Sequence, residues 1–202
     1  MSKKPTVLVF DLGGVLVDWN GIDPLIRLSG GRLSREEARL FWMHFHWTEK
    51  LDLGACTPLE FSAAMADELR LDLSAEAMQA QLRSWNRGAF PGARALLEKL
   101  SADWQLAALS NINSLHWQQV SEEFQLLDLF GHTFASFQLR LRKPQPEIYR
   151  HVQQTLGLAP ADIAFFDDNI ECVAAARAEG WQAFHTIGFD SLQRTLREQG
   201  WL

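Results

Sequence analysis

The stretch Val7-Leu-Val-Phe-Asp-Leu-Gly-Gly-Val15 decides the fold of this chain of 202 residues. Its first four residues form a short, wholly apolar run, which is typical of a strand buried on both faces of a parallel sheet. Asp11 follows the run directly, and Gly13 and Gly14 indicate a turn after the strand. An acidic side chain at this point stands where open α/β sheets bind their ligands.

Apolar runs of the same kind recur along the chain, with helical patterns between them. They predict strands at 107–109, 132–136, 163–166 and 182–185. The helices are predicted from apolar stripes at 93–100 and 148–156 and from the segment 173–179, with Gly157 and Gly180 at two of the helix ends. Strands that alternate with helices imply βαβ units. We therefore expect an α/β fold with a Rossmann-like parallel sheet, covered by helices on both faces.

The segment 20–87 has a different pattern, because it holds several helix starts and no convincing apolar strand. Ser34–Glu37 and Thr57–Glu60 are capping boxes, and Ser74 is suited to cap a further helix. We expect a small helical cap domain inserted after the first strand. The predicted boundaries are residues 1–18 and 88–202 for the core and residues 19–87 for the cap.

Aromatic residues are unusually frequent in one part of this insertion. They predict a core for the insertion itself, and the alternative is that some of them face a substrate together with His44 or His46. The residues concerned are Phe41, Trp42, Phe45 and Trp47.

The overall composition excludes several classes of protein. Nineteen Lys and Arg against 25 Asp and Glu give a formal net charge of −6, which argues against nucleic acid as a partner.

The sequence also lacks the signals of a membrane or secreted protein. No apolar run approaches the roughly 18 residues of a membrane span. Asp11 interrupts the apolar run after Lys3 and Lys4 too early for a secretory signal. Cys56 and Cys172 show no metal or disulfide spacing. We expect a cytoplasmic protein without a membrane partner.

Four polar clusters stand at or near the predicted carboxyl ends of strands. They are Asp11, Ser110-Asn111, Lys143 and Asp167-Asp168. Converging carboxylates require a cation among them if all are to stay ionised. Oxygen-only ligands favour Mg²⁺ over zinc or iron. An ammonium group and backbone N–H groups beside such an ion suit a phosphoryl group.

These clusters, in this order, resemble the motifs of the haloacid dehalogenase superfamily of phosphohydrolases. The four matching stretches are Val7–Val15, Leu109-Ser-Asn, Arg142-Lys-Pro and Phe166-Asp-Asp-Asn. A single motif of this length arises by chance, whereas four in order are specific. The resemblance covers essentially the whole chain, and the long first gap matches the place of the family's helical cap. A branch of bacterial relatives with a similar Asp-Leu-Gly start is associated with the hydrolysis of sugar 1-phosphates.

The resemblance implies a metal-dependent nucleophile. Asp11 would attack phosphorus and become an aspartyl phosphate. Asp11, the main-chain carbonyl of Gly13 and Asp168 would hold Mg²⁺, and Asp167 would bind it directly or through a water molecule.

The resemblance also implies a phosphate-binding set. Ser110 and the amide of Asn111 would hold the phosphoryl oxygens, beside the turn at Gly13 and Gly14. Lys143 would neutralise charge on the nucleophile and on the phosphoryl group.

One position departs from the family pattern. Typical phosphatases of this family carry a second Asp two residues after the nucleophile as acid and base, and here that residue is Gly13. A sugar 1-phosphate would lessen the need for an acid, because its leaving oxygen is less basic than that of an ordinary alcohol. Asp18 or a cap histidine such as His46 would be candidate replacements.

Two other functions stay open at this point. A 2-haloacid dehalogenase also lacks the second Asp and needs no metal, but two further carboxylates beside Asp11 would repel a haloacid. A non-catalytic phosphate-binding relative is disfavoured by the intact motifs. We therefore predict an Mg²⁺-dependent phosphatase of a small phosphorylated metabolite, such as a hexose 1-phosphate, working as a monomer or small homo-oligomer.

Overall fold

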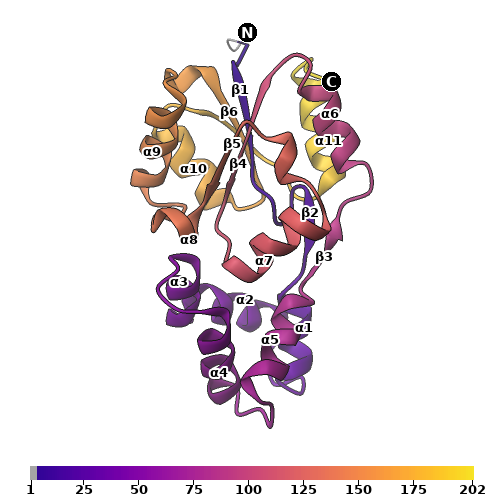
Figure 1. Cartoon of the computed structure of the whole chain (residues 1–202), viewed down its shortest axis with the longest axis vertical. Coiled ribbons are helices and arrows are strands. Elements are labelled where there is room, and N and C mark those ends of the chain that lie inside the picture. The colour runs from indigo at the N-terminus through magenta and orange to yellow at the C-terminus, as the bar shows by residue number, and fades with distance from the viewer. Residues whose placement is uncertain (1–3) are drawn as a thin grey trace.

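A five-stranded parallel sheet forms the centre of the computed structural model, which describes residues 4–202. The strands lie in the order β5-β4-β1-β6-β7 (Figure 1). Their bounds are Val7–Phe10 (β1), Gln105–Ser110 (β4), His132–Ala135 (β5), Ile163–Asp167 (β6) and Gln182–His185 (β7). The chain therefore has the predicted α/β fold. β1 is central because it pairs with both β4 and β6, and Phe10 lies between Ala108 and Phe166.

Successive residues of β1 face opposite sides of the sheet, as the period of a strand requires. Leu8 and Phe10 belong to one buried cluster, whereas Val7 and Val9 belong to another. Helices cover both sides (Figure 1). On one side lie α6 (Ala93–Leu100) and α11 (Phe189–Glu198), and on the other lie α9 (Pro146–Leu156) and α10 (Ile170–Ala178). The predicted helix at 173–179 thus begins earlier, at Ile170.

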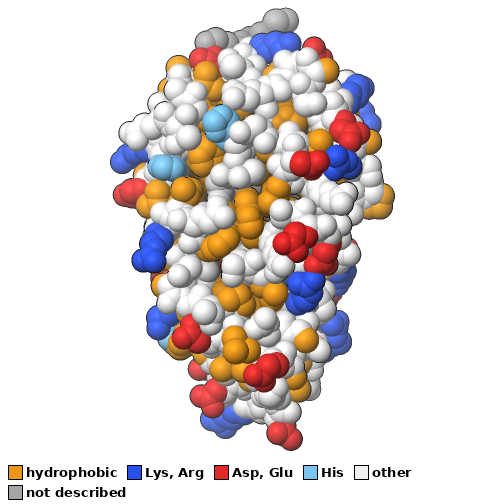
Figure 2. All heavy atoms as spheres, in the orientation of Figure 1, with side chains coloured by type: hydrophobic (Ala, Val, Ile, Leu, Met, Phe, Trp, Pro, Cys, Tyr) orange, Lys and Arg blue, Asp and Glu red, His pale blue; other side chains and the backbone are white. Residues whose placement is uncertain are grey.

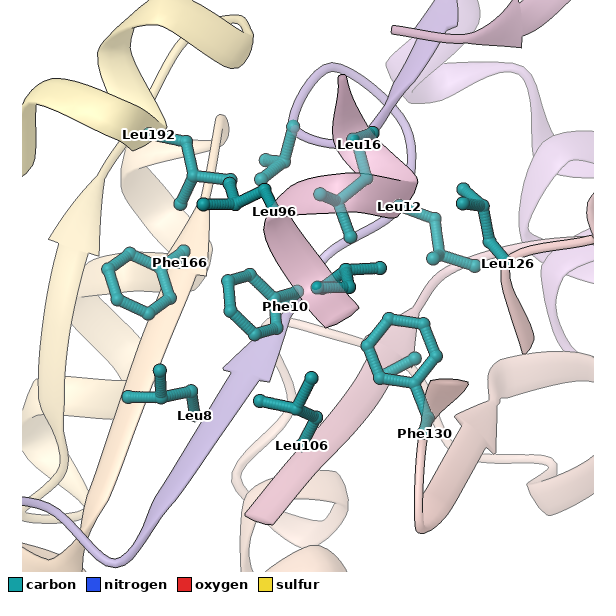
Figure 3. Close-up of a cluster of buried hydrophobic side chains, with 14 of the residues drawn as sticks. Leu8, Phe10, Leu12, Leu16, Leu96, Leu106, Leu126, Phe130, Phe166 and Leu192 are labelled. Atoms are coloured by element: carbon teal, nitrogen blue, oxygen red, sulfur yellow. The ribbon is translucent and has the colours of Figure 1, made fainter. Parts of the chain in front are cut away.

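Phe10 is the centre of the first cluster (Figure 3). Its ring stacks on Phe166 with centroids 5.1 Å apart, and the ring of Phe130 lies 6.4 Å away. Phe10 and Phe166 are both completely buried, and burial of such a side chain contributes about 1.5–3 kcal/mol. This packing fixes the end of β1, and with it the residue that follows.

Five helices lie together at one end of the molecule (Figure 1). Both predicted capping boxes are present. The hydroxyl groups of Ser34 and Thr57 each accept from the backbone N–H of the glutamate three positions on, and their own backbone N–H groups donate to the carboxylate of that glutamate. The five helices share a buried cluster that contains Phe61, Met65 and Trp85. Their bounds are Ile22–Leu28 (α1), Arg35–His44 (α2), His46–Asp52 (α3), Pro58–Glu68 (α4) and Ala75–Arg83 (α5).

A two-stranded antiparallel ribbon joins these helices to the sheet. It consists of β2 (Val17–Trp19) and β3 (Asn86–Ala89). The expectation that the segment 20–87 contains no strand is therefore wrong at the C-terminal end of the segment, where β3 begins at Asn86. The segment Asn86–Ala89 contains no apolar or β-branched run that would predict a strand. It is extended because the chain crosses between the helical half and the sheet half here and at β2, and the two crossing segments pair. The predicted domain boundaries fall within this ribbon, and the division into core and cap stays a prediction.

The remaining elements are short. They are α7 (Ser114–Gln118), the π-helical turn η1 (Gln119–Glu123), the 3₁₀ turns η2 (Leu127–Leu129) and η3 (Pro160–Asp162), and α8 (Ser136–Leu139). Within residues 4–202, no helix combines the length and the apolar character that crossing a membrane requires. Figure 2 shows acidic and basic side chains interspersed along the edges of one face, with hydrophobic side chains nearer its middle.

His116 connects the two halves of the molecule, because its ring joins α7 to α5. Nε2 lies 2.8 Å from the carbonyl oxygen of Leu82, and Nδ1 lies 3.2 Å from Nδ2 of Asn113. We assign the proton to Nε2, since a carbonyl oxygen only accepts. Burial lowers the pKa of His116 to about 4, against a smaller opposite effect of the Leu82 carbonyl.

This pKa predicts a pH-dependent stability. Between pH 6.5 and 4 the unfolded chain binds a proton at His116 that the folded chain does not bind, so the folded state loses about 3 kcal/mol as the pH falls. Urea unfolding at pH 7 and pH 4 tests this against His116→Gln. The stability advantage of the wild type over the variant should shrink by that amount at pH 4. An unchanged advantage would contradict the prediction.

Candidate active site

Asp11 stands where β1 ends, at the centre of the sheet's carboxyl edge. The backbone turns back directly after it, since Leu12 accepts hydrogen bonds from the N–H groups of Leu16 and Val17. The N–H of Leu12 donates to Oδ1 of Asp11 at 2.7 Å. Asp11 is almost fully buried. The turn therefore holds the carboxylate in one place.

Lys143 brings two strand ends together. Its Nζ lies 2.5 Å from Oδ2 of Asp167 and 3.1 Å from Oδ1 of Asp11, and the side chain is buried. Burial lowers the pKa of Lys143, but the charges of Asp11 and Asp167 outweigh burial and hold that pKa well above its usual value. Lys143 is therefore a permanent cation between two carboxylates.

Asn111 holds the backbone of Lys143 in register with the sheet. Its Nδ2 donates to the carbonyl oxygen of Lys143 at 2.8 Å, and its Oδ1 accepts from the N–H of Lys143 at 2.9 Å. This side chain thus positions the lysine, which is a task that the sequence did not indicate. Ser110 precedes it at the buried end of β4 and lines the same cavity as Asp11.

Asp167 is fully buried and uses both carboxylate oxygens within the protein. Oδ2 accepts from Lys143, and Oδ1 accepts from the N–H of Asn169 at 2.7 Å. Asp168 is more exposed than Asp167 and lies against the turn that follows β1. A Cβ at Gly14 would come within 2.2 Å of Oδ2 of Asp168, so Gly14 leaves the space that this carboxylate occupies.

Three carboxylates converge here, as the sequence predicted. Asp11, Asp167 and Asp168 each offer one oxygen, and these atoms lie within 4.8 Å of one another. The pKa of Asp11 is raised to about 6 by burial, which outweighs the opposing charge of Lys143. The pKa of Asp168 is raised to about 7 by burial and by the charges of Asp11 and Asp167. One ammonium group does not compensate this cluster, and an oxygen-only donor set suits a hard divalent cation.

A cavity of about 650 Å³ opens over the cluster, between the sheet edge and the helical half. Asp11, Ser110 and Lys143 line one end of it. From the helical half, its lining residues are Trp19, Ile22, Arg39, Trp42, Met43, His44, Thr48, Asp52 and Asn86.

The predicted aromatic group divides between two roles. Trp42 lines the cavity with His44, and it also packs edge-on against Phe61 and Trp85. The other rings pack within the helical half, where Phe41, Phe45 and His46 line a separate hollow.

Neither suggested replacement acid lines the cavity over Asp11 in the described part of the chain. His46 lies at the separate hollow, and Asp18 is half-exposed, with Oδ2 at 3.7 Å from Nη1 of Arg87. Sequence reasoning missed Asp52, which lines the cavity and lies 3.3 Å from Nη2 of Arg142. No motif marks Asp52, because it reaches the site only through the packing of α3.

The comparisons with known proteins agree with this geometry. A family model described as haloacid dehalogenase-like hydrolase matches residues 5–180. The chain belongs to the haloacid dehalogenase-like hydrolases. One relative of this family is the sesquiterpene phosphatase astK of Aspergillus oryzae, which is 31% identical over 88% of this chain and 87% of its own.

Solved structures place the chain in the same family. A haloacid dehalogenase family enzyme of Bacteroides thetaiotaomicron superposes with a TM-score of 0.79 and 25% identity over 93% of this chain and 97% of its own. A second structure of that enzyme, at 23% identity and a TM-score of 0.72 over 90% and 94% of the chains, is a complex with magnesium and inorganic phosphate. L-2-haloacid dehalogenase of Xanthobacter autotrophicus shares the fold at a TM-score of 0.65 and 21% identity over 96% and 83% of the chains.

The contact between Gly14 and Asp168 predicts an unequal effect of two alanine substitutions. Gly14 and Gly157 both have positive φ, +72° and +66°, so alanine at either position meets about 1–2 kcal/mol of backbone strain. Within residues 4–202, no atom beyond the two neighbouring residues in the chain lies within 4 Å of a Cβ at Gly157. We expect Gly14→Ala to cost about 1–3 kcal/mol more than Gly157→Ala in urea unfolding without added metal. Equal costs would mean that Asp168 moves aside freely.

Proposed function

We propose that this hydrolase is a phosphatase that cleaves a small phosphate monoester through an aspartyl phosphate at Asp11. The observation that carries the proposal is the buried contact of Lys143 with both Asp11 and Asp167, beside a third carboxylate on Asp168. A nucleophile, a fixed cation and an acidic cluster meet at the floor of one cavity. Phosphoryl transfer needs this kind of positioning and charge compensation.

The acidic cluster fits Mg²⁺. All of its donors are oxygen atoms, and the pKa values of Asp11 and Asp168 are raised mainly by burial and further by the neighbouring carboxylates. A divalent cation would favour the ionised form of both groups. Asp11, the carbonyl of Gly13 and Asp168 would hold the ion, with Asp167 direct or through a water molecule. When bound, the ion neutralises charge on the phosphoryl oxygens. The relative crystallised with magnesium and phosphate supports this proposal.

The chain's own residues would perform the following tasks. Asp11 attacks phosphorus with one carboxylate oxygen, and the resulting acyl phosphate is then hydrolysed. The transferring phosphoryl group would be surrounded by Ser110, the backbone N–H of Asn111 and the turn at Gly13 and Gly14. Lys143 stays charged throughout, since its pKa is held well above the usual value, and it offsets the charge on the phosphoryl oxygens.

Residues 19–87 would serve as a cap that chooses the leaving group. Side chains of this segment line the cavity opposite Asp11, and Trp19 and Trp42 form part of its wall, with ring centroids 5.5 Å apart. A cavity of about 650 Å³ suits a metabolite. The sequence suggests a hexose 1-phosphate as a candidate substrate. The similarity to a sesquiterpene phosphatase suggests a phosphate ester of an apolar alcohol as a second candidate.

Metal-independent dehalogenation is the alternative. The fold is shared with a 2-haloacid dehalogenase, so the fold does not discriminate. The carboxylates of Asp167 and Asp168 favour the phosphatase, because without a cation they would repel a carboxylate substrate from Asp11.

Removing the nucleophile tests the proposal. We expect Asp11→Asn to lower the rate of phosphate release by at least about 10³-fold, because an amide does not form the acyl phosphate. Release is measured with Mg²⁺ from sugar phosphates, nucleotides, prenyl phosphates and p-nitrophenyl phosphate. Asp18→Asn is the matched control, since Asp18 lies in β2 and does not line the cavity. Full activity of Asp11→Asn would reject the mechanism, and halide release from 2-chloropropionate without metal would establish the dehalogenase.

Removing a ligand tests the metal assignment. We expect Asp168→Ala to raise the Mg²⁺ concentration for half-maximal activity by about tenfold or more, because one carboxylate of the cluster is lost. The measurement is a Mg²⁺ titration of phosphate release after chelation. An unchanged Mg²⁺ requirement would remove Asp168 from the proposed site.

A further inference from the structure

The proposed reaction lacks a proton donor for the leaving group. Gly13 has no side chain, although a Cβ there would make only an ordinary van der Waals contact, at 3.5 Å, with the Cβ of Trp19, so the sequence and not a lack of space leaves this position without an acid. An alkoxide is a poor leaving group, and a placed acid contributes about 10²–10⁴-fold. The cavity must therefore supply the acid from elsewhere if ordinary alcohols are to leave.

Most titratable residues of the cavity wall outside the carboxylate cluster are unsuited. Both ring nitrogens of His116 have partners in the protein. Nε2 of His185 lies 2.8 Å from the carbonyl oxygen of Asp168, and His44 and Glu171 are exposed. Asp52 differs from all of these, because it is a buried carboxyl group on the wall opposite Asp11.

The structure assigns Asp52 as the general acid and base of the proposed phosphatase. This inference rests on the proposed function and adds the residue that transfers the proton. Asp52 ends α3 and reaches the cavity from the helical half, while its partner Arg142 directly precedes Lys143. The carboxyl group is thus tied to the same loop that holds the cation beside the nucleophile.

The surroundings of Asp52 point to a bound ligand. Thr48 lies one helical turn earlier on the same face of α3, lines the cavity and is 3% exposed. Its hydroxyl has no hydrogen-bond partner within residues 4–202, and neither does the buried Nε of Arg142. A buried polar group without a partner costs free energy, so these groups fit an oxygen of the leaving group or its water.

The loop after Asp52 is seated closely on the core. Gly54 has φ +64°, and a Cβ there would lie 2.5 Å from the carbonyl oxygen of Phe137. This contact and the ion pair with Arg142 fix the end of α3 relative to the sheet half.

The acid strength of Asp52 is suited to this task. Burial raises its pKa to about 6, while Arg142 and Lys143 lower that pKa, and Glu49 and Asp11 raise it. A carboxyl group with this pKa exists in both protonation states near pH 6. Arg142 stabilises the carboxylate that remains after the proton has left.

The steps balance as follows. Asp11 forms a bond to phosphorus while the bond from phosphorus to the ester oxygen breaks, and its electron pair stays on that oxygen, which takes the proton of Asp52. The alcohol departs. The Asp52 carboxylate then takes a proton from water as the water oxygen forms a bond to phosphorus. The bond between phosphorus and the Asp11 oxygen breaks, and its electron pair returns to the Asp11 carboxylate. Inorganic phosphate leaves, and the Asp52 carboxyl group is restored.

Dependence on the leaving group tests this assignment. p-Nitrophenyl, phenyl and benzyl phosphates are similar in size, but their leaving oxygens are increasingly basic and increasingly need a proton. We expect Asp52→Asn to lower kcat/KM for benzyl phosphate by about 10²–10⁴-fold and for p-nitrophenyl phosphate by less than about tenfold. The variant is nearly isosteric and keeps an oxygen that accepts from Arg142. Asp67→Asn, which changes an exposed acid of α4 that does not line the cavity, should leave all three values unchanged.

Other outcomes overturn the assignment. An equal loss on all three esters would mean that Asp52 only holds the fold, and no loss would mean that another group gives the proton. A wild-type protein that releases no phosphate from any of them would reject the phosphatase itself.

If Asp52→Asn fails to fold, Gly54→Ala provides the same comparison, because it displaces Asp52 but keeps its carboxyl group. We expect Gly54→Ala to lose activity selectively on benzyl phosphate.

Discussion

The buried contact of Lys143 with Asp11 and Asp167 is the interaction on which the site depends. An unpaired ammonium or carboxylate in this place would be strongly destabilising, so each charge requires the others. Two of the three groups come from the ends of adjacent strands, β1 and β6, and the third comes from the loop before α9. Asn111 at the end of β4 fixes that loop through two hydrogen bonds to the backbone of Lys143. The parallel sheet is therefore what makes the charged cluster possible.

The cluster carries an excess of negative charge. One cation faces three carboxylates, and burial with mutual repulsion raises the pKa of Asp168 to about 7. A protein selected for stability alone would avoid such an arrangement, because buried like charges cost free energy. Strain of this kind is expected where a ligand relieves it. The second half of the molecule adds an apolar wall and a second set of polar groups over Asp11.

Several features of the structure cross the junction between the helical half and the sheet half. They are the β2–β3 ribbon, the contact of His116 with Leu82, the ion pair between Asp52 and Arg142, and the close approach of Gly54 to Phe137. These contacts hold the wall of the cavity over Asp11. In the proposed phosphatase, enclosure of a substrate and placement of its proton donor would depend on the same junction, because Asp52 and Trp42 both lie on the helical half of the cavity wall.

The sequence by itself determined the sheet, the helix starts and the carboxylate cluster, because each of these has a local signal. Buried strands are apolar runs, capping boxes are read from four residues, and polar residues after parallel strands meet at one edge. Only the tertiary structure decided the role of the Asn111 side chain, the β2–β3 ribbon and the position of Asp52. Asn86–Ala89 has no strand pattern, and Asp52 resembles any acidic residue at the end of a helix. Their roles arise from contacts between residues that lie far apart in the sequence. Asn111 and Lys143 are 32 positions apart, and the partners in the ribbon and in the ion pair of Asp52 are about 70 to 90 positions apart. No local pattern encodes such contacts.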